Sequence, residues 1–179
     1  MATTKLFFAG SGGQGVLTMG QMLTYAAMYA DMNATWLPSY GPEMRGGTSN
    51  CTVVVSDEEI GSPSVSTPDI LVAMNLPSFD KFEPKVAPGG TLFCDSTLVD
   101  KKSAREDITA VYIPATGLAS DNDLTGFANV IVLGAILKVT GIFDFADFED
   151  YLLSNIPAAK TALIEKNRKA LELGWNYLQ

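Results

Sequence analysis

The pattern of hydrophobic positions along the chain predicts short strands that alternate with helices. Short apolar runs typical of buried strands are separated by longer apolar or amphipathic stretches. Strands are expected at residues 4–9, 34–37, 48–56, 69–75, 91–95 and 108–114, and helices at 15–32, 77–86, 122–140, 145–155 and 157–178. This alternation is typical of an α/β fold with three layers, α/β/α, around a mostly parallel sheet.

One pair of predicted strands is expected to break the parallel pattern. The strand at 48–56 follows the strand at 34–37 after a turn-rich stretch that contains no crossover helix. Parallel neighbours need such a crossover, so the sequence predicts a mixed sheet. No repeat, low-complexity tract or linker interrupts the chain, and we expect residues 1–179 to form a single domain.

The first predicted helix, at residues 15–32, is unusual because almost every position from 16 to 30 is apolar or small. A helix without a polar face is expected to be buried on most sides. Gly20 in its interior is unfavourable unless another backbone packs close to it.

Composition and charge exclude several classes of function. The chain has 179 residues and a net charge of −8, which disfavours nucleic acid and anionic membranes as partners. It has no histidine, so the commonest general base and metal ligand is missing. Cys51 and Cys94 lie in apolar strand-like runs and predict buried, reduced thiols, too few for an iron–sulfur cluster. We therefore expect no catalytic residue and no metal site in this chain.

The sequence contains no segment that resembles a signal peptide or a membrane span. Its apolar runs are shorter than the roughly 20 residues that a transmembrane helix needs. We therefore expect a cytoplasmic protein.

A glycine-rich turn connects the first predicted strand to the first predicted helix. Gly10, Gly12 and Gly15 match the G-x-G-x-x-G spacing of dinucleotide-binding turns. Bare backbone N–H groups and the helix dipole at such a turn attract a phosphate or a carboxylate. The acidic residue that binds the ribose of NAD about 20 positions further on is missing, so NAD is disfavoured. The candidate binding residues are Gly12, Gly13, Gln14 and Gly15; the alternative is a tight turn without a ligand.

A second candidate site is the glycine-flanked stretch at residues 39–47. Its Arg45 is the only Lys or Arg between Lys5 and Lys81, and arginine is a favoured anchor in binding surfaces. Because the stretch follows the second strand, it could lie beside the glycine turn at the carboxyl edge of the sheet. The alternative is a Glu43–Arg45 pair that only fixes the loop. The candidate binding residues here are Tyr40, Glu43, Met44, Arg45, Gly46 and Gly47.

Polar residues at the ends of two further strands are weaker candidates. Asn75 lies at the end of one apolar strand and Asp95 at the end of another, so both could face the same crevice. Capping of the segment that follows is the expected role of each side chain. Asn75 is retained as a candidate binding residue.

The two glycine-rich segments occur together, as Phe-Ala-Gly-Ser-Gly-Gly-Gln-Gly at residues 8–15 and Ser-Tyr-Gly-Pro-Glu-Met-Arg-Gly-Gly at 39–47. In this order they resemble the gamma subunit of the 2-oxoacid:ferredoxin oxidoreductases, in a form closest to the 2-oxoglutarate branch. Pro42 departs from that form, in which a small residue is expected. The resemblance continues through residues 68–75 and 88–90 and covers about residues 4–175.

The resemblance implies a subunit of an enzyme of anaerobic metabolism. Such an enzyme oxidatively decarboxylates a 2-oxoacid, releases an acyl-CoA and passes electrons to ferredoxin. Thiamine diphosphate, magnesium and iron–sulfur clusters would lie on alpha, beta and ferredoxin-like partner subunits, and coenzyme A would be the co-substrate. This chain would complete the wall of the thiamine site and would be inactive alone.

Two other functions remain open from the residues. One is a stand-alone nucleotide- or CoA-binding module, which as an isolated chain could form a homodimer. The other is a flavodoxin-type electron carrier, which is less favoured because its phosphate loop would be rich in hydroxyl groups rather than glycines.

Overall fold

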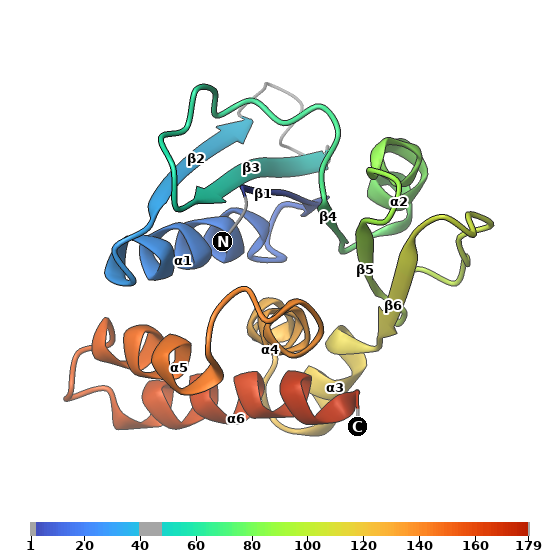
Figure 1. Cartoon of the computed structure of the whole chain (residues 1–179). Helices are drawn as coiled ribbons and strands as arrows, with labels where there is room; N and C mark the ends of the chain where they lie inside the picture. The colour runs from blue at the N-terminus through green and yellow to red at the C-terminus, as the bar shows by residue number, and fades with distance from the viewer. Residues whose placement is uncertain (1–2, 40–47, 179) are drawn as a thin grey trace.

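The computed structural model describes residues 3–39 and 48–178 (Figure 1). The strands are β1 (Thr4–Ser11), β2 (Asn33–Ser39), β3 (Thr48–Ser56), β4 (Ile70–Ala73), β5 (Thr91–Asp95) and β6 (Thr109–Ile113). The helices are α1 (Val16–Tyr29), α2 (Leu76–Phe82), α3 (Ala115–Asp121), α4 (Ala128–Thr140), α5 (Phe145–Ser154) and α6 (Thr161–Tyr177), with a short 3-10 helix at Glu83–Lys85.

The described residues form a six-stranded sheet in the order β2-β3-β1-β4-β5-β6. β3 pairs antiparallel with both of its neighbours, whereas β1, β4, β5 and β6 pair in parallel. The expected mixed, mostly parallel sheet is confirmed. The chain leaves β1 toward one edge of the sheet and leaves β4 toward the other, so the direction of the connections reverses between these two strands.

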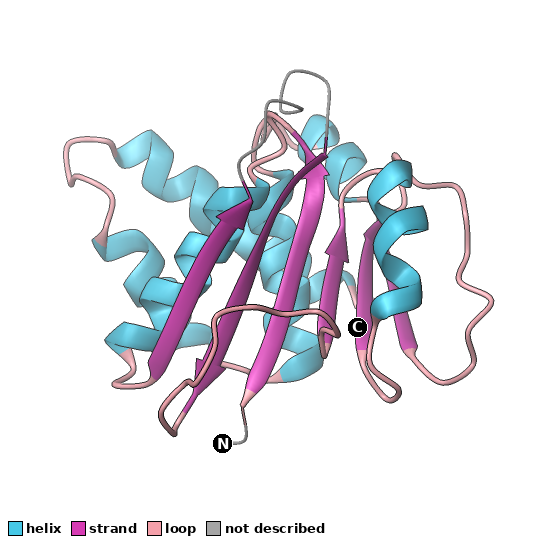
Figure 2. Cartoon of the chain, turned by 90° about the horizontal axis from the view of Figure 1, so that it is seen from above, coloured by secondary structure: helices cyan, strands magenta, loops and turns pink. Residues whose placement is uncertain are grey.

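Helices cover both faces of the sheet, as expected for a three-layer fold. α1 and α4 lie against one face and α2 against the other, while α6 packs on the outer side of α4 (Figure 1). The loop between β3 and β4 crosses the face that carries α2, in front of the strands in Figure 2. The Thr52 hydroxyl of β3 donates a hydrogen bond of 3.0 Å to the Pro63 carbonyl of this loop, and Val65 of the loop is buried.

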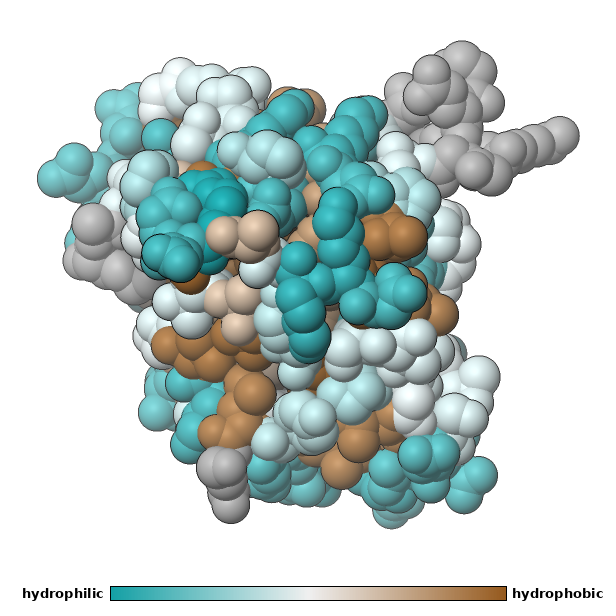
Figure 3. Space-filling model, turned by 90° about the vertical axis from the view of Figure 1, so that its right-hand side faces the viewer, coloured by the Kyte–Doolittle hydropathy of each residue, from teal (hydrophilic) through white to brown (hydrophobic). Residues whose placement is uncertain are grey.

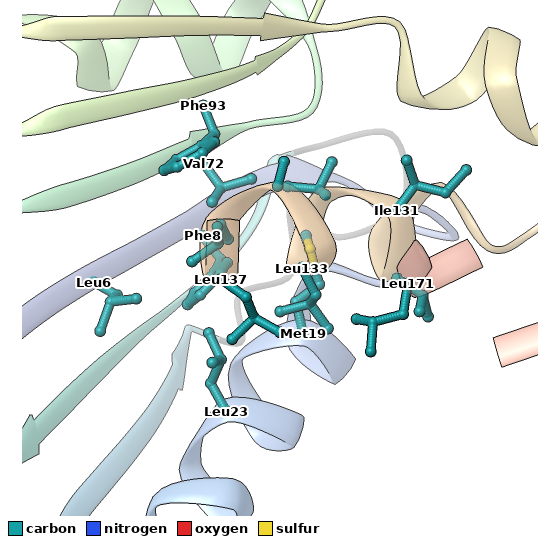
Figure 4. Packing of buried hydrophobic residues seen from close by; sticks show 14 of the residues in the cluster. Leu6, Phe8, Met19, Leu23, Val72, Phe93, Ile131, Leu133, Leu137 and Leu171 are labelled. Carbon is teal, nitrogen blue, oxygen red and sulfur yellow. The ribbon is translucent and has the colours of Figure 1, made fainter. Parts of the chain in front are cut away.

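The centre of the core is α4, which lies between the sheet and α6. Every residue from 129 to 137 is buried, so this helix has no polar face. Figure 4 shows Leu133 and Leu137 of α4 among side chains of α1 and the sheet, including Met19 and Phe8. A helix covered on two sides is expected to be apolar all round, which explains the sequence of α4.

α4 and α6 are in direct backbone contact. A Cβ atom added at Gly174 would lie 1.7 Å from the carbonyl oxygen of Ile131, and one added at Gly134 would lie 2.1 Å from that of Leu171. Both glycines therefore allow a close approach that no other residue permits.

The structure corrects the predicted helix at 122–140, which begins only at Ala128. Asp123 and Gly126 have positive φ values of 58° and 92°, so the chain turns where the helix was expected to start. α3, immediately before this turn, was not predicted. The strands at 48–56 and 91–95 are observed with the expected limits.

α1 is less buried than its composition predicts. Tyr25, Met28 and Tyr29 are exposed on the half of the helix that is far from the glycine turn. Gly20 is packed as expected of an interior glycine, but against the side chains of Cys51 and Trp36 rather than against a backbone. Cys51 and Cys94 are both buried and free, as expected.

Within residues 3–39 and 48–178, no helix is long and apolar enough to cross a membrane.

Candidate functional site

The glycine turn joins the end of β1 to the start of α1 in a left-handed backbone conformation. Gly13 has a φ of 93° and Gly15, the N-terminal capping residue of α1, has a φ of 73°. Among residues 3–39 and 48–178, no side chain accepts a hydrogen bond at this helix end. Within this part of the chain, the first N–H groups of α1 are therefore free to donate to a further acceptor.

The side chain of Gln14 connects this turn to the end of β4. Its Oε1 accepts hydrogen bonds from the Ser11 N–H (2.7 Å) and the Ser11 hydroxyl (3.0 Å), and its Nε2 donates to the Met74 carbonyl (2.8 Å). The backbone N–H of Gln14 donates to the Ser11 carbonyl, so it is not a free donor as the sequence predicted. Gln14 is thus a positioning residue that fixes the turn.

A cavity of about 350 Å³ opens beside this turn at the carboxyl ends of the parallel strands. Gly13 and Gln14 contribute the turn to its wall, Met74 follows β4, and Thr116 lies in α3. The cavity lies where the connections reverse between β1 and β4. Open α/β sheets bind their ligands at this position, so the cavity is the candidate site.

The polar side chains that the described residues contribute to the cavity are uncharged. The described lining residues include the hydroxyl side chains of Thr116, Ser120 and Thr125 but no Asp, Glu, Lys or Arg. The described lining therefore offers hydrogen bonds from hydroxyl groups and from backbone N–H groups, but no general acid or base.

Asp95 stabilises the far wall of this cavity. Its carboxylate is fully buried and accepts hydrogen bonds from the Thr97 N–H (3.1 Å) and from the Thr116 N–H (3.2 Å) and hydroxyl (2.5 Å). A buried carboxylate needs such donors. Asp95 therefore ties the start of α3 to the end of β5, which confirms the expected capping role.

Asn75 also has the expected capping role. It is the N-terminal cap of α2, and its side chain accepts a hydrogen bond of 3.0 Å from the Ser78 N–H. It is not among the residues that line the candidate cavity.

The second predicted site falls outside the described residues. This applies to Tyr40, Glu43, Met44, Arg45, Gly46 and Gly47. The residues that follow this stretch are placed by the sheet register, in which Thr48 lies opposite Ser11 and Ser49 opposite Gly10. Thr48, the first described residue after this stretch, therefore lies beside the glycine turn.

Asn129 of α4 is a residue of this region that the sequence did not single out. Its Nδ2 atom lies 3.5 Å from the Gly15 carbonyl oxygen. A Cβ atom added at Gly15 would lie only 2.4 Å from the same Nδ2 atom. The signal in the sequence was a single asparagine at the start of an apolar helix. Asn129 occupies the space that the absent side chain of Gly15 leaves.

The described residues do not fit an iron–sulfur cluster or a metal ion. Cys51 and Cys94 belong to two separate hydrophobic clusters, on opposite faces of the sheet. Among residues 3–39 and 48–178, no group of three or more His, Cys, Asp or Glu side chains could hold a metal.

The surface beside α2, β6 and α3 has no single apolar face. Figure 3 shows this side of the molecule, where hydrophobic residues reach the surface in separate areas between hydrophilic ones.

Taken together, the fold and the cavity define a doubly wound α/β protein with a candidate crevice at the carboxyl edge of its sheet. The family model described as pyruvate ferredoxin/flavodoxin oxidoreductase matches residues 5–177. The chain belongs to this family.

Two curated relatives illustrate its range. The chain is 43% identical over 172 residues to the ketoisovalerate oxidoreductase subunit VorA of Methanothermobacter marburgensis, covering 95% of this chain and 35% of the relative. It is 38% identical over 174 residues to the 2-oxoglutarate synthase subunit KorC of Methanocaldococcus jannaschii, covering 96% of this chain and 91% of the relative. The chain thus spans about a third of the ketoisovalerate oxidoreductase subunit that it matches.

A solved structure agrees with the fold. The gamma subunit of a keto/oxoacid ferredoxin oxidoreductase from Geobacter sulfurreducens superimposes with a TM-score of 0.82 at 32% identity, covering 96% of both chains. The resemblance to gamma subunits of this family is confirmed.

Proposed function

We propose that this chain is the gamma subunit of a multi-subunit 2-oxoacid:ferredoxin oxidoreductase, which converts a 2-oxoacid to an acyl-CoA and reduces ferredoxin. The observation that carries the proposal is the family match over residues 5–177. The candidate cavity is consistent with it, because its described lining offers hydrogen bonds but no catalytic group. The chain would complete a site whose chemistry resides on other subunits.

We propose a 2-oxoacid as the class of substrate, and 2-oxoglutarate is the first member of the class to assay. The relatives are named for different oxoacids, so the family alone does not select one. The segment at residues 39–47 resembles the form found in the 2-oxoglutarate branch, which makes this oxoacid the first to assay.

Thiamine diphosphate, magnesium and the iron–sulfur clusters are proposed to lie on alpha, beta and ferredoxin-like partners. Coenzyme A is the proposed co-substrate. The backbone N–H groups of Gly12, Gly13 and Gly15 would donate hydrogen bonds to one of its phosphates or to a backbone carbonyl of a partner. Gln14 would hold the turn in place through the Met74 carbonyl.

Affinity purification of the tagged chain from its native anaerobic host tests the assignment. The preparation is assayed with several 2-oxoacids, coenzyme A and a viologen dye. We expect larger subunits with a brown chromophore and dye reduction that depends on both substrates. A colourless chain without partners that still binds coenzyme A would support a stand-alone binding module instead.

Arg45 is proposed as an anchor for a partner or for an anionic group, with Glu43 orienting it. Arg45→Ala should weaken assembly or raise the apparent KM for coenzyme A. Lys166→Ala, an exposed position on α6, is the matched control for loss of a positive charge. Equal assembly and equal kinetics in both variants would overturn the role of Arg45.

A further inference from the structure

A second cavity is lined by residues of α1, α4, α5 and α6. Figure 1 shows these four helices on the same face of the sheet. The cavity has a volume of about 330 Å³, which is within the range of small-molecule sites. Met22 of α1, Val130 of α4, Leu152 of α5 and Leu163 of α6 form its apolar wall. Gly126 lines both this cavity and the candidate site, so the two cavities are neighbours.

Three asparagines and Tyr151 line this otherwise apolar cavity, and two of the asparagines are almost fully buried. Asn129 is 7% exposed and Asn167 is 5% exposed, whereas Asn155 lies at the rim. Each directs its Nδ2 to a backbone carbonyl, that of Gly15, Leu163 and Tyr151 respectively. The carboxamides are therefore held in fixed orientations.

The carboxamide oxygens of the two buried asparagines remain without a partner among the described residues. Three described side-chain atoms are fully buried without a hydrogen-bond partner, and they belong to Thr35, Trp36 and Ser78. The two asparagine oxygens are not among them, so these oxygens are not fully buried. Since Asn129 and Asn167 line the cavity, their oxygens can accept hydrogen bonds from an occupant.

The described lining of this cavity contains no Asp, Glu, Lys or Arg. An ion placed there would lose water without gaining a countercharge, and an anion would also face the asparagine oxygens. An occupant without hydrogen-bond donors would leave both oxygens unpaired. The lining thus selects for a neutral, mainly apolar molecule with N–H or O–H groups.

We propose that this cavity, called the asparagine pocket, is a binding site for an uncharged small molecule that carries an apolar body and an amide or hydroxyl donor. A concave site formed by separate helices fits a small molecule better than the flat surface of a partner. The site is distinct from the cavity at the glycine turn, and the proposal does not depend on the proposed function.

The test uses the full chain labelled with ¹⁵N and two matched probes, phenylacetamide and phenylacetate. The probes have nearly the same shape, but only the amide is neutral and donates N–H groups. We expect phenylacetamide to shift the side-chain amide signals of Asn129, Asn155 and Asn167 saturably, and phenylacetate to bind at least about tenfold more weakly. Equal binding of the two probes, or no saturable shift at millimolar concentrations, would overturn the proposal.

A variant that fills the asparagine pocket provides a second test of the proposal. Leu163→Trp places a larger ring at a rim position that is 36% exposed, and it should weaken phenylacetamide at least about tenfold. Val139→Trp, at a 40% exposed position of α4 outside the pocket, should leave binding unchanged. Unchanged binding in Leu163→Trp would contradict the assignment, and the comparison of probes on the unaltered chain does not depend on either variant folding.

The purified complex distinguishes a small-molecule site from the seat of a partner segment. Phenylacetamide should bind the complex and the isolated chain alike, as measured by saturation transfer to the probe. Binding to the isolated chain that is lost in the complex would show that a partner fills the pocket, and would overturn the small-molecule proposal.

Discussion

Gly15 and Asn129 are adapted to each other across the glycine turn. We predict that Gly15→Ala destabilises the chain by at least about 2 kcal/mol, because the left-handed φ of 73° strains any side chain and the new Cβ overlaps Asn129. Gly13→Ala is the matched control, since it has a φ of 93° but no atom within 4 Å of its Cβ. Urea unfolding measures the difference.

The double variant Gly15→Ala, Asn129→Ala separates strain from overlap. Removing the Asn129 side chain relieves the overlap but not the left-handed strain, so the double variant should be less destabilised than the sum of the two single variants. If the changes in the free energy of unfolding of the two single variants add up to that of the double variant, the Cβ atom at position 15 does not overlap the Asn129 side chain.

Both cysteines are held in the thiol form. Burial raises the pKa of Cys51 to about 12, and burial together with the Asp95 carboxylate raises the pKa of Cys94 to about 12. Above the ordinary pKa of 9.0 the unfolded chain loses these protons while the folded chain keeps them. The folded state then binds more protons, so its stability must fall as pH rises from about 9 toward about 12.

We predict a loss of up to about 1.4 kcal/mol per pH unit for each thiol over this interval. Urea unfolding at several pH values measures the slope, and the double variant Cys51→Ala, Cys94→Ala should lack this part of it. A slope that is the same with and without the thiols would contradict the prediction. At neutral pH, thiol reagents should react with the unfolded chain and not with the folded one.

At the scale of elements, the contact between α4 and α6 depends on the absence of a side chain. Gly174→Ala is predicted to destabilise the chain by about 3 kcal/mol or more, because its Cβ would meet the Ile131 carbonyl at 1.7 Å and neither backbone can yield alone. Gly61→Ala, in a loop with open space around the new Cβ, should change stability little. Similar midpoints of thermal unfolding for the two variants would show that α4 and α6 can move slightly apart without a loss of stability.

The sequence predicted the elements best where burial decides the pattern. β5 has the limits expected from its apolar run, since strands covered on both faces are rich in apolar residues. β3 has the expected limits because its residues 51–55 are rich in β-branched side chains. α3 was missed because it contains Gly117 and follows Pro114, and its start is stabilised by Asp95, which is 21 residues away from Thr116. Contacts over that distance leave no local signal.

The candidate site shows the same limit. The spacing of the glycines and their place between a strand and a helix identified the turn, because those features are local. The contact of Gln14 with Met74 joins residues 60 positions apart, and that of Asn129 with Gly15 joins residues 114 positions apart. The sequence therefore located the turn but could not show what holds it, nor that Gln14 acts through its side chain.

At the scale of the whole molecule, the fold divides into a rigid centre and exposed connections. α4 is enclosed by the sheet and α6, whereas residues 157–163 and the loop at 57–59 are exposed. The glycine turn is joined to the centre twice, through Asn129 of α4 and through the Met74 carbonyl after β4. The candidate site is therefore held at two points, and a site held in this way is preorganised and need not be ordered by a ligand.

We therefore predict that amide hydrogens of residues 131–137 exchange with solvent only when the whole chain unfolds. Their free energy of opening should equal the free energy of unfolding and decrease with denaturant at the same slope, because no smaller opening exposes a helix covered on two sides. The Met74 N–H, which donates to the Ala9 carbonyl at 2.9 Å, should belong to the same group, whereas amides at 157–160 should exchange by local motion. Native-state hydrogen exchange measures both sets. If Met74 opens at a much lower free energy than α4, the wall of the candidate site moves independently of the core, and its ligand would have to order it on binding.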